Sequence, residues 1–389
     1  MSGEAPIDRP AAPTRAAPRA PGSPLRRWWR RIGKAALGTL AALALLALLE
    51  GVISFAVVAR SIATKTNPLF RESRQKMTRF DPELGWAPTA GYRDASAFGP
   101  GRGVAIGPQG FRGERSVAEQ VAPGRVRAVL AGDSFAFGTG VADAETWASG
   151  LERREPRLDV ANLAVGGYGC DQAFLRYRRD AAAFEHQLLF FAFITEDLRR
   201  MVVPAEWGAE KPQLALRDGK LAALNLPLEQ VDPRMRFLRQ AGTFVQELRL
   251  VQLAARVTGI ERPAPNLSHD AALRELTAAL LVELAELAKA RGAHLVVIHL
   301  PVEGERGGGS IDALGPELAQ QVRAQGGDWI DLLAEFRALP EADHAALFLE
   351  PGSYGAGHYD AAACERVAGW IHAKLRALPE VARRLDAAR

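Results

Sequence analysis

The feature that most constrains the fold is a regular alternation of short apolar runs with stretches of helical periodicity between residues 126 and 375. Continuous apolar runs closed by turn residues are typical of strands buried on both faces, and leucines spaced three or four residues apart indicate helices. The predicted strands are 126–131, 158–165, 187–194, 294–300 and 329–332, and the predicted helices are 146–153, 172–184, 268–291 and 360–375. This alternation predicts an α/β fold with a doubly wound, mostly parallel five-stranded sheet flanked by helices.

A longer apolar run at residues 35–59 precedes this region and is interrupted only by Glu50-Gly51. At ~1.5 Å per residue a helix of this length crosses a ~30 Å hydrocarbon layer. A secretory signal has a shorter apolar region of ~7–15 residues, so a retained transmembrane helix is predicted. Glu50 has two explanations that the sequence leaves open. It faces a partner helix or a locally wet spot, or the span starts near Leu25 and Glu50 approaches the far interface.

Basic charge is concentrated ahead of this run. Residues 1–34 carry eight Lys or Arg against two acidic residues, whereas the rest of the chain carries 41 basic against 43 acidic residues. A nucleic-acid site needs its basic residues on the folded domain, so the pI of about 9.2 gives no reason to expect one. The positive-inside rule instead predicts a single-pass protein of the inner (cytoplasmic) membrane. Its N-terminus is then cytoplasmic, and residues 60–389 are periplasmic or extracellular.

Four regions follow from these patterns: a disordered basic tail at 1–34, the transmembrane helix at 35–59, an irregular lead-in at 60–120 and the α/β domain at 121–380. An insertion at 199–232 contains Asp218-Gly219 between alternating stretches, which predicts a hairpin. This hairpin is either a lid over the carboxyl edge of the sheet or a decoration at its border. The two cysteines, Cys170 and Cys364, are expected to be small buried thiols, and they are too few for a four-cysteine zinc site.

Polar residues follow the predicted strands at the points where ligands bind in such folds. Ser134 comes directly after the first strand in Gly132-Asp133-Ser134, and a serine nucleophile needs a base and hydrogen-bond donors for the oxyanion. A glycine-rich turn, Gly166-Gly167-Tyr168-Gly169, follows the second strand, and it is either a place where backbone N–H groups approach an oxyanion or a plain tight turn. Thr195-Glu196-Asp197 ends the third strand, and its side chains either face the site or cap a helix.

A base for this nucleophile is predicted at His358, which follows a glycine-rich loop and opens the last helix. His299, in an apolar strand, is expected to be a satisfied core residue. The sequence has no Gly-Lys-Ser/Thr phosphate loop and no Gly-x-Gly-x-x-Gly turn after Ser134, so a nucleotide-binding protein is not predicted. No metal or cofactor is expected.

Taken in order, these motifs resemble the SGNH/GDSL hydrolase family. They are Gly132-Asp133-Ser134-Phe135, Asn162 with Gly167 five residues later, the polar turn after the third strand, and the late His358. The segments Gly85-Trp86, Gly110-Phe111-Arg112 and Glu145-Thr146-Trp147 resemble the membrane-anchored bacterial branch, and the resemblance covers roughly residues 78–376. It implies an SGNH/flavodoxin-like fold. The activity it implies is that of a serine esterase or O-acyltransferase that acts on acylated cell-surface glycan through an acyl-serine. An O-acyltransferase would also have a membrane acyl-transfer partner.

Residue by residue, the resemblance makes Ser134 the nucleophile and first oxyanion donor, Gly167 the second donor and His358 the general base. Asp133, Glu196 and Asp197 are expected to line the site. The chain departs from the family at two positions: Glu196 stands where the family has a donating Asn, and Gly355 stands where it has the triad acid. A Ser–His dyad or a substitute acid, Glu350 or Asp360, accounts for the second departure. A catalytically degenerate module that binds glycan or a membrane partner is the alternative to an enzyme.

Overall fold

The centre of the protein is a five-stranded parallel sheet. The computed structural model describes residues 24–65, 76–206, 209–230, 232 and 270–388. The strands are β5 (Val126–Gly132), β6 (Leu158–Asn162), β7 (Leu188–Phe193), β12 (His294–His299) and β13 (Asp328–Asp331), arranged in the order β13-β12-β7-β5-β6. All four neighbouring pairs are parallel. This is the doubly wound order of flavodoxin-like folds, so the predicted fold class is confirmed.

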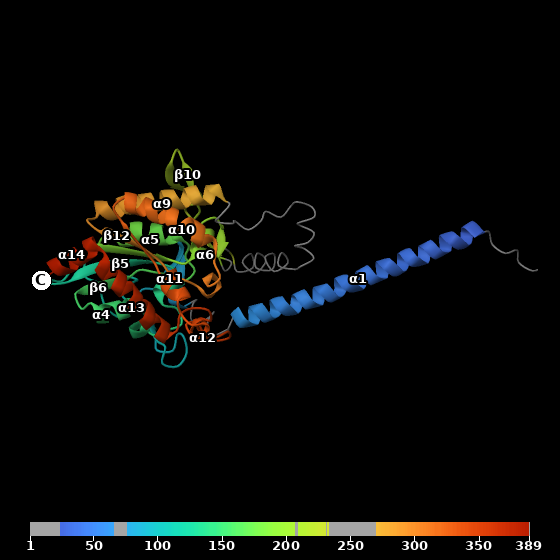
Figure 1. The fold of residues 1–389 in the computed structure, drawn as a ribbon, viewed down its shortest axis with the longest axis horizontal. Helices are drawn as coiled ribbons and strands as arrows, with labels where there is room; N and C mark the ends of the chain where they lie inside the picture. Colours follow the sequence, from blue (N-terminus) through green and yellow to red (C-terminus); the bar gives the residue numbers. More distant parts are fainter. Residues whose placement is uncertain (1–23, 66–75, 207–208, 231, 233–269, 389) are drawn as a thin grey trace, which may run out of the picture.

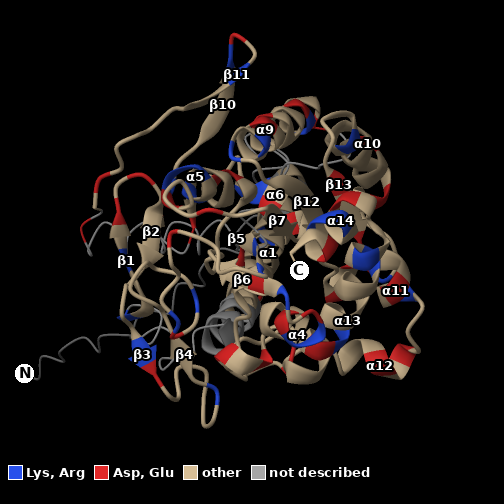
Figure 2. Ribbon diagram, turned by 90° about the vertical axis from the view of Figure 1, so that its left-hand side faces the viewer, with Lys and Arg blue, Asp and Glu red and all other residues tan. Residues whose placement is uncertain are grey.

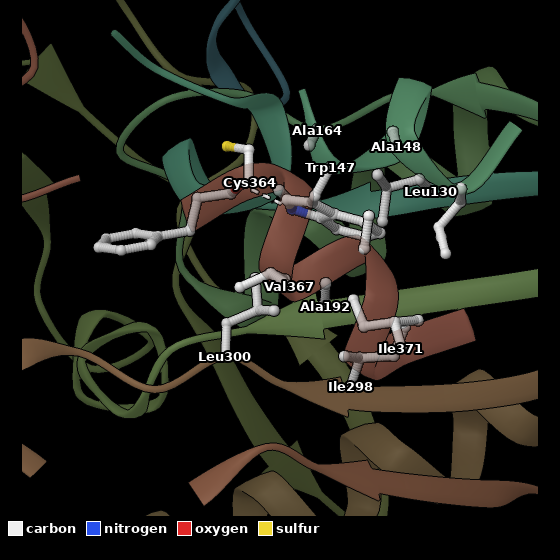
Figure 3. Packing of buried hydrophobic residues seen from close by; sticks show 14 of the residues in the cluster. Leu130, Trp147, Ala148, Ala164, Ala192, Ile298, Leu300, Cys364, Val367 and Ile371 are labelled. Carbon is white, nitrogen blue, oxygen red and sulfur yellow. Dashed lines mark hydrogen bonds between the residues drawn. The ribbon is translucent and has the colours of Figure 1, made fainter. Parts of the chain in front are cut away.

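Helices cover both faces of the sheet (Figures 1 and 2). One layer contains α4 (Trp147–Arg154), α13 (Ala361–Ala377) and α14 (Pro379–Ala387), and the other contains α5 (Cys170–Asp180), α9 (Ala271–Ala290) and α10 (Ser310–Ala324). Successive strand residues alternate between the two apolar clusters, as the pleat requires: Leu130 faces the first layer and Val129 the second. Figure 3 shows Trp147 among Val367 and Ile371 of α13 and the strand residues of the first cluster.

The structure contains elements that the sequence patterns did not predict. Helix α10 was not predicted because its sequence contains two residues that usually interrupt helices. Gly309 is its N-cap residue, and Pro316 lies inside it. Its apolar face (Ile311, Leu314, Leu318 and Val322) is nevertheless buried, and this packing outweighs the cost of the proline. Short helical segments also connect the described elements: α3 (Ser134–Phe137), η1 (Asp143–Glu145), α6 (Thr195–Arg200), η2 (Glu303–Glu305), α11 (Leu333–Arg337) and α12 (Glu341–Ala345).

The lead-in forms two small antiparallel hairpins, β1 (Thr78–Asp81) with β2 (Gly85–Pro88) and β3 (Arg93–Asp94) with β4 (Val104–Ala105). Residues 66–75 lie outside the described residues. The lead-in is irregular, as expected, but it is also part of the core. Leu84, Trp86 and Phe111 are buried in the cluster beside the sheet, while Phe98 and Ile106 belong to the cluster on the other face.

The inserted hairpin consists of β10 (Leu214–Arg217) and β11 (Lys220–Ala223), joined through Asp218 and Gly219 with φ of 52° and 73°. Two positive φ angles are what a tight two-residue hairpin loop requires, and Asp-Gly supplies them. The hairpin projects beyond α9 in Figure 1, and Leu216 and Leu221 pack against the cluster on that side of the sheet. A shorter pair, β8 (Ala205–Glu206) with β9 (Ala209–Glu210), precedes it.

Helix α1 (Pro24–Lys65) contains one stretch, Arg31–Val52, that is long and apolar enough to cross a membrane. This finding rests on length and composition and fits a membrane anchor or a signal sequence. The tail predicted as disordered to residue 34 is helical from Pro24, because Leu25, Trp28 and Ile32 continue the apolar helical spacing. Residues 1–23 of that tail lie outside the described residues.

Two expectations about single residues can be compared with the structure. Glu50 lies near the end of the apolar stretch and accepts a hydrogen bond from Ser54 Oγ (2.9 Å), and both explanations of its place in the span stay predictions. Cys170 and Cys364 are free and buried, and they belong to the clusters on opposite faces of the sheet. The expected small buried thiols are confirmed. Burial raises the pKa of both thiols above the usual range, so neither is a reactive thiolate.

Candidate active site

Ser134 is the first residue of α3, and only Asp133 separates it from the end of β5, the strand between β7 and β6. Asp133 caps this short helix, because its Oδ1 accepts hydrogen bonds from the backbone N–H groups of Phe135 (2.9 Å) and Ala136 (3.4 Å). The strand can turn here only at a glycine: a Cβ on Gly132 would lie 2.3 Å from the carbonyl oxygen of Ala192 on β7. The turn places Ser134 between β5 and β7, where the strand order reverses and doubly wound folds bind ligands.

His358 lies beside Ser134 although 224 residues separate them in the chain. Its Nε2 is 2.8 Å from Ser134 Oγ, and its Nδ1 is 2.9 Å from the carbonyl oxygen of Gly355. A carbonyl oxygen only accepts hydrogen bonds, so Nδ1 carries the hydrogen and Nε2 is left to accept the Ser134 proton. The imidazole also packs on the Phe135 ring, with centroids 4.7 Å apart. The structure therefore places the Ser134 hydroxyl beside a ring nitrogen that can accept its proton.

Gly355 stands where the SGNH/GDSL family has its triad acid, and its backbone carbonyl, not a side chain, contacts His358. Gly355 has φ of +81°, a left-handed conformation, and a Cβ there would lie 2.9 Å from Cα of Gly140. Neither acid considered from the sequence takes over: Asp360 caps α13 by accepting from Ala363 N (2.7 Å), and Glu350 is exposed. Among the described residues, the Nδ1 partner of His358 is the Gly355 carbonyl. The arrangement is a Ser–His dyad oriented by the main chain.

The turn after β6 carries Gly166 and Gly167. Gly167 has φ of +79°, and Tyr168 N donates to Val165 O (3.3 Å) to close the turn. The indole Nε1 of Trp86 donates to the carbonyl oxygen of Gly166 (3.0 Å). In a trans peptide the carbonyl and the following N–H point in opposite directions, so Trp86 fixes the direction of the Gly167 N–H. Sequence reasoning identified Gly167 but not the Trp86 that orients its peptide.

The three polar residues after β7 point in different directions. Thr195 Oγ1 contacts Glu305 and His299 Nε2 (3.2 Å), while His299 Nδ1 contacts Asp331 (3.0 Å). His299 is thus the satisfied core residue that was expected. Glu196 pairs with Arg199 and is about two-fifths exposed, so it does not line the site as predicted. The cause is the i,i+3 attraction of Arg199 along α6.

Asp197 is buried, where it both caps α6 and holds Arg200. Neither Asp197 nor Asp133 is among the residues that line the cavity beside Ser134, although both were expected to line the site. Its Oδ2 accepts from Ile194 N (3.0 Å) and its Oδ1 accepts from Arg200 Nη1 (2.6 Å). Arg200 Nη1 also lies 3.8 Å from Asp133 Oδ2, which is itself 3.2 Å from Ser134 Oγ. Arg200 was missed by sequence reasoning, although its three-residue spacing from Asp197 on a helix signals a pair.

Burial sets the protonation of the dyad. It lowers the pKa of His358 below its usual value of 6.5, although the nearby Asp133 acts in the opposite direction. The pKa of Asp133 is raised above its usual value, again by burial, with Arg200 opposing the shift. A lowered His358 pKa keeps the imidazole neutral at pH 7, the form that can accept a proton from serine.

Ser134 and His358 open into a cavity of about 170 Å³. The polar side chains of Thr78, Thr139 and Arg200 and the backbone of Gly166 also line it. Its walls are mostly apolar and come largely from the lead-in and from the residues around the dyad: Met77, Trp86, Pro88, Phe98, Ile106, Phe135, Phe137, Val165 and Tyr354. No residue of the β10–β11 hairpin lines it, so the lid interpretation of that hairpin is not supported.

Three further side chains hold the segments of the site together. Arg112 donates to the carbonyl oxygens of Phe137 (2.7 Å) and Val141 (2.7 Å) and pairs with Asp143, so it organises the chain after Ser134. Trp147 Nε1 donates to Phe135 O (3.0 Å). Asn162 Nδ2 donates to Ala136 O (3.0 Å) and thereby ties the second strand to α3.

No protein-family model matches the sequence, and no curated protein matches it. The chain is similar to several solved structures. TesA is 14% identical with a TM-score of 0.39, over 64% of this chain and 98% of that chain. The esterase EstA from Pseudoalteromonas sp., inhibited by monoethylphosphonate, is 11% identical with a TM-score of 0.37, over 64% and 97%. A GDSL-like lipase from Bacteroides thetaiotaomicron is 13% identical with a TM-score of 0.36, over 67% and 93%. At these values, the function has to be judged from this chain's own residues.

Proposed function

We propose that this protein is a serine hydrolase of ester bonds that works through an acyl-Ser134 intermediate. The observation that carries the proposal is the 2.8 Å contact between His358 Nε2 and Ser134 Oγ, with Nδ1 fixed by the Gly355 carbonyl. A nucleophile within hydrogen-bond reach of an oriented base is the signature of covalent acyl transfer. A module that only binds glycan or a membrane partner has no need for a fixed tautomer, so the dyad favours the enzyme.

The dyad's chemistry follows from its protons. Ser134 Oγ attacks the ester carbonyl carbon while its proton passes to His358 Nε2, and the carbonyl oxygen becomes an oxyanion. Collapse of this intermediate breaks the bond to the alcohol oxygen, which takes the proton from His358 and leaves. A second hydroxyl then attacks the acyl-serine, gives its proton to His358 and releases the acyl group, and Ser134 regains its proton. With water the result is hydrolysis, and with a sugar hydroxyl it is O-acyl transfer.

The backbone N–H groups of Ser134 and Gly167 are the proposed first two oxyanion donors. Ser134 N is at the start of α3, where helix N–H groups have no intrahelical partners. The Gly167 N–H has its direction fixed by the Trp86–Gly166 hydrogen bond. Donors held in place before the reaction lower the barrier because they need no reorganisation when the charge forms.

The cavity bears on the acyl group. Apolar side chains from residues 77–106 and 135–137 line most of it, and its volume is about 170 Å³. A dry apolar cavity of about 150 Å³ holds one benzene molecule, so this one suits an acyl chain of roughly six carbons better than an acetyl group. The acyl chain occupies the cavity, and the alcohol part lies towards the opening. A membrane anchor at 35–59 would hold the domain at the outer face of the inner membrane. The proposed substrate there is an acylated cell-surface glycan.

The decisive experiment is labelling of the full-length protein in detergent with a fluorophosphonate, which bonds to an activated serine and releases fluoride. We expect rapid labelling of the wild type, none in Ser134→Ala, and a loss of at least about 10²-fold in rate in His358→Ala. Ser116→Ala, which removes an exposed serine, is the matched control and should label normally. Labelling that persists in Ser134→Ala, or is absent from the folded wild type, would rule out this nucleophile.

A further inference from the structure

The resemblance to the SGNH/GDSL family implies a third oxyanion donor at residue 196, and Glu196 does not supply one. The Glu196 side chain turns away from the cavity to pair with Arg199, and a carboxylate accepts hydrogen bonds rather than donating them. Another side chain of α6 is then free to meet part of the charge that develops on the carbonyl oxygen. One side chain of this helix does line the cavity together with Ser134 and His358, and it is Arg200.

Arg200 reaches the site because helix side chains point back towards the N-terminus. Its Nη1 donates to Asp197 Oδ1 (2.6 Å) and, at 3.4 Å, to the carbonyl oxygen of Tyr168, which follows the Gly166-Gly167 turn. The same atom is 3.8 Å from Asp133 Oδ2, beside the nucleophile. The guanidinium therefore lies between the nucleophile turn and the glycine turn, where the other two donors are.

The Arg200 guanidinium is held by hydrogen bonds at one nitrogen, and its other N–H groups are available as donors. Within the described part of the chain, its hydrogen bonds are all made by Nη1, which leaves Nη2 and Nε for a bound group. Its side chain is 16% exposed and Asp197 is 2% exposed, so the pair is shielded from water. Burial opposes its charge, but Asp197 and Asp133 raise the pKa of Arg200 above its ordinary value, so the group stays cationic at any working pH.

We infer that Arg200 is a catalytic residue, whose guanidinium donates to the ester carbonyl oxygen as that oxygen becomes an oxyanion. The inference rests on the proposed function. Asp197 is then a positioning residue, since it fixes Nη1 and thereby the direction of the remaining N–H groups. A charge-assisted hydrogen bond is stronger than one from a neutral amide, so a guanidinium is an effective substitute for an asparagine donor.

The test compares steady-state kinetics of Arg200→Gln and Arg200→Ala with the wild type, on a neutral ester of a medium-length acyl chain. Loss of one oxyanion donor lowers kcat by about 10²–10³-fold. We expect that loss with KM changed by less than about threefold, because the oxyanion exists in the transition state and not in the bound ester. Added guanidinium ion should restore part of the kcat of Arg200→Ala and none of Ser134→Ala. Arg199→Gln, which faces solvent on the same helix, is the matched control and should keep full activity.

Removal of Arg200 also leaves the buried Asp197 unpaired, so folding needs its own control. The double variant Arg200→Gln/Asp197→Asn replaces the ion pair with two neutral amides. We expect it to fold and to keep the low kcat of the single Arg200 variants. Unchanged kcat in the folded variants, or a rise in KM without a loss of kcat, would overturn the inference and leave the proposed function standing. Full hydrolysis by Ser134→Ala would instead remove the proposed function itself.

Discussion

His358 Nδ1 lies 2.9 Å from the carbonyl oxygen of Gly355, the residue three positions before it in the chain. The same carbonyl oxygen accepts from the backbone N–H of His358 (2.9 Å), so one main-chain group orients both the residue and its ring. A carboxylate at this place would orient the ring and stabilise the imidazolium, whereas a carbonyl supplies the orientation with only a partial charge. The dyad thus keeps the correct tautomer while giving less support to the charged form of His358.

Gly355→Asp, which introduces an acid where the SGNH/GDSL family has one, should not create a Ser–His–Asp triad. A residue with a Cβ at φ of +81° is strained by about 1–2 kcal/mol, and this Cβ would lie 2.9 Å from Cα of Gly140. We expect a lower melting temperature and a lower kcat, measured by thermal unfolding and ester hydrolysis. Gly352→Asp is the control, since Gly352 has φ of +88° with no atom within 4 Å. A kcat above the wild-type value in Gly355→Asp would show that an acid can act from this position.

The acid limb of the pH–rate profile should report on His358. The imidazole is active as a base only when neutral, so kcat/KM rises as pH increases through its pKa. Burial lowers that pKa, and the midpoint is therefore expected below the ordinary value of 6.5. Asp133 acts to raise the pKa of His358, so Asp133→Asn, which keeps a helix-capping side chain, should move the midpoint to still lower pH. A midpoint at or above pH 6.5 in the wild type would contradict the prediction that burial lowers the pKa of His358.

The sequence predicted the parts of this site that depend on strand ends, and it missed the parts that depend on packing. Ser134 and Gly167 follow neighbouring parallel strands, so their approach could be foreseen from the alternation of elements. Arg200 is one of two adjacent arginines at the end of a helix, a pattern that ordinarily means solvent exposure. Its place at the cavity depends on the way α6 packs, which turns Arg199 outwards and Arg200 inwards.

Two other misses have similar causes. Residues 77–106 look irregular in sequence, because their strands have two to four residues and no measurable period. Their contribution to the cavity comes from long-range contacts, such as the one between Trp86 and Gly166. The hairpin at 214–223 was recognised from Asp218-Gly219, but local turn chemistry does not say which side of the sheet it packs against.

The cavity predicts a preference among acyl chains. Each buried methylene contributes about 0.8 kcal/mol, so kcat/KM should rise roughly fourfold per methylene until the chain fills the cavity near six carbons. Met77→Trp, which places a larger side chain in the wall, should reduce hexanoyl ester hydrolysis at least about tenfold and spare the acetyl ester. The exposed Leu224→Trp on the hairpin is the control. An unchanged chain-length profile in Met77→Trp would mean that the acyl group binds elsewhere.

The fully buried ion pair between Lys211 and Asp171 should be the most sensitive polar contact for stability. Both side chains have no exposed surface, and Lys211 Nζ also donates to the carbonyl oxygen of Arg200 (2.9 Å), so the pair fixes the insertion against α6. Lys211→Met strands a buried carboxylate, which costs about 3–5 kcal/mol and lowers the melting temperature by roughly 10 °C. Lys211→Met/Asp171→Leu removes both charges and should recover most of the loss, while the exposed Lys220→Met should have little effect. A melting temperature of Lys211→Met equal to that of the wild type would show that the ion pair does not hold the insertion. Other contacts would then have to support the Arg200 backbone.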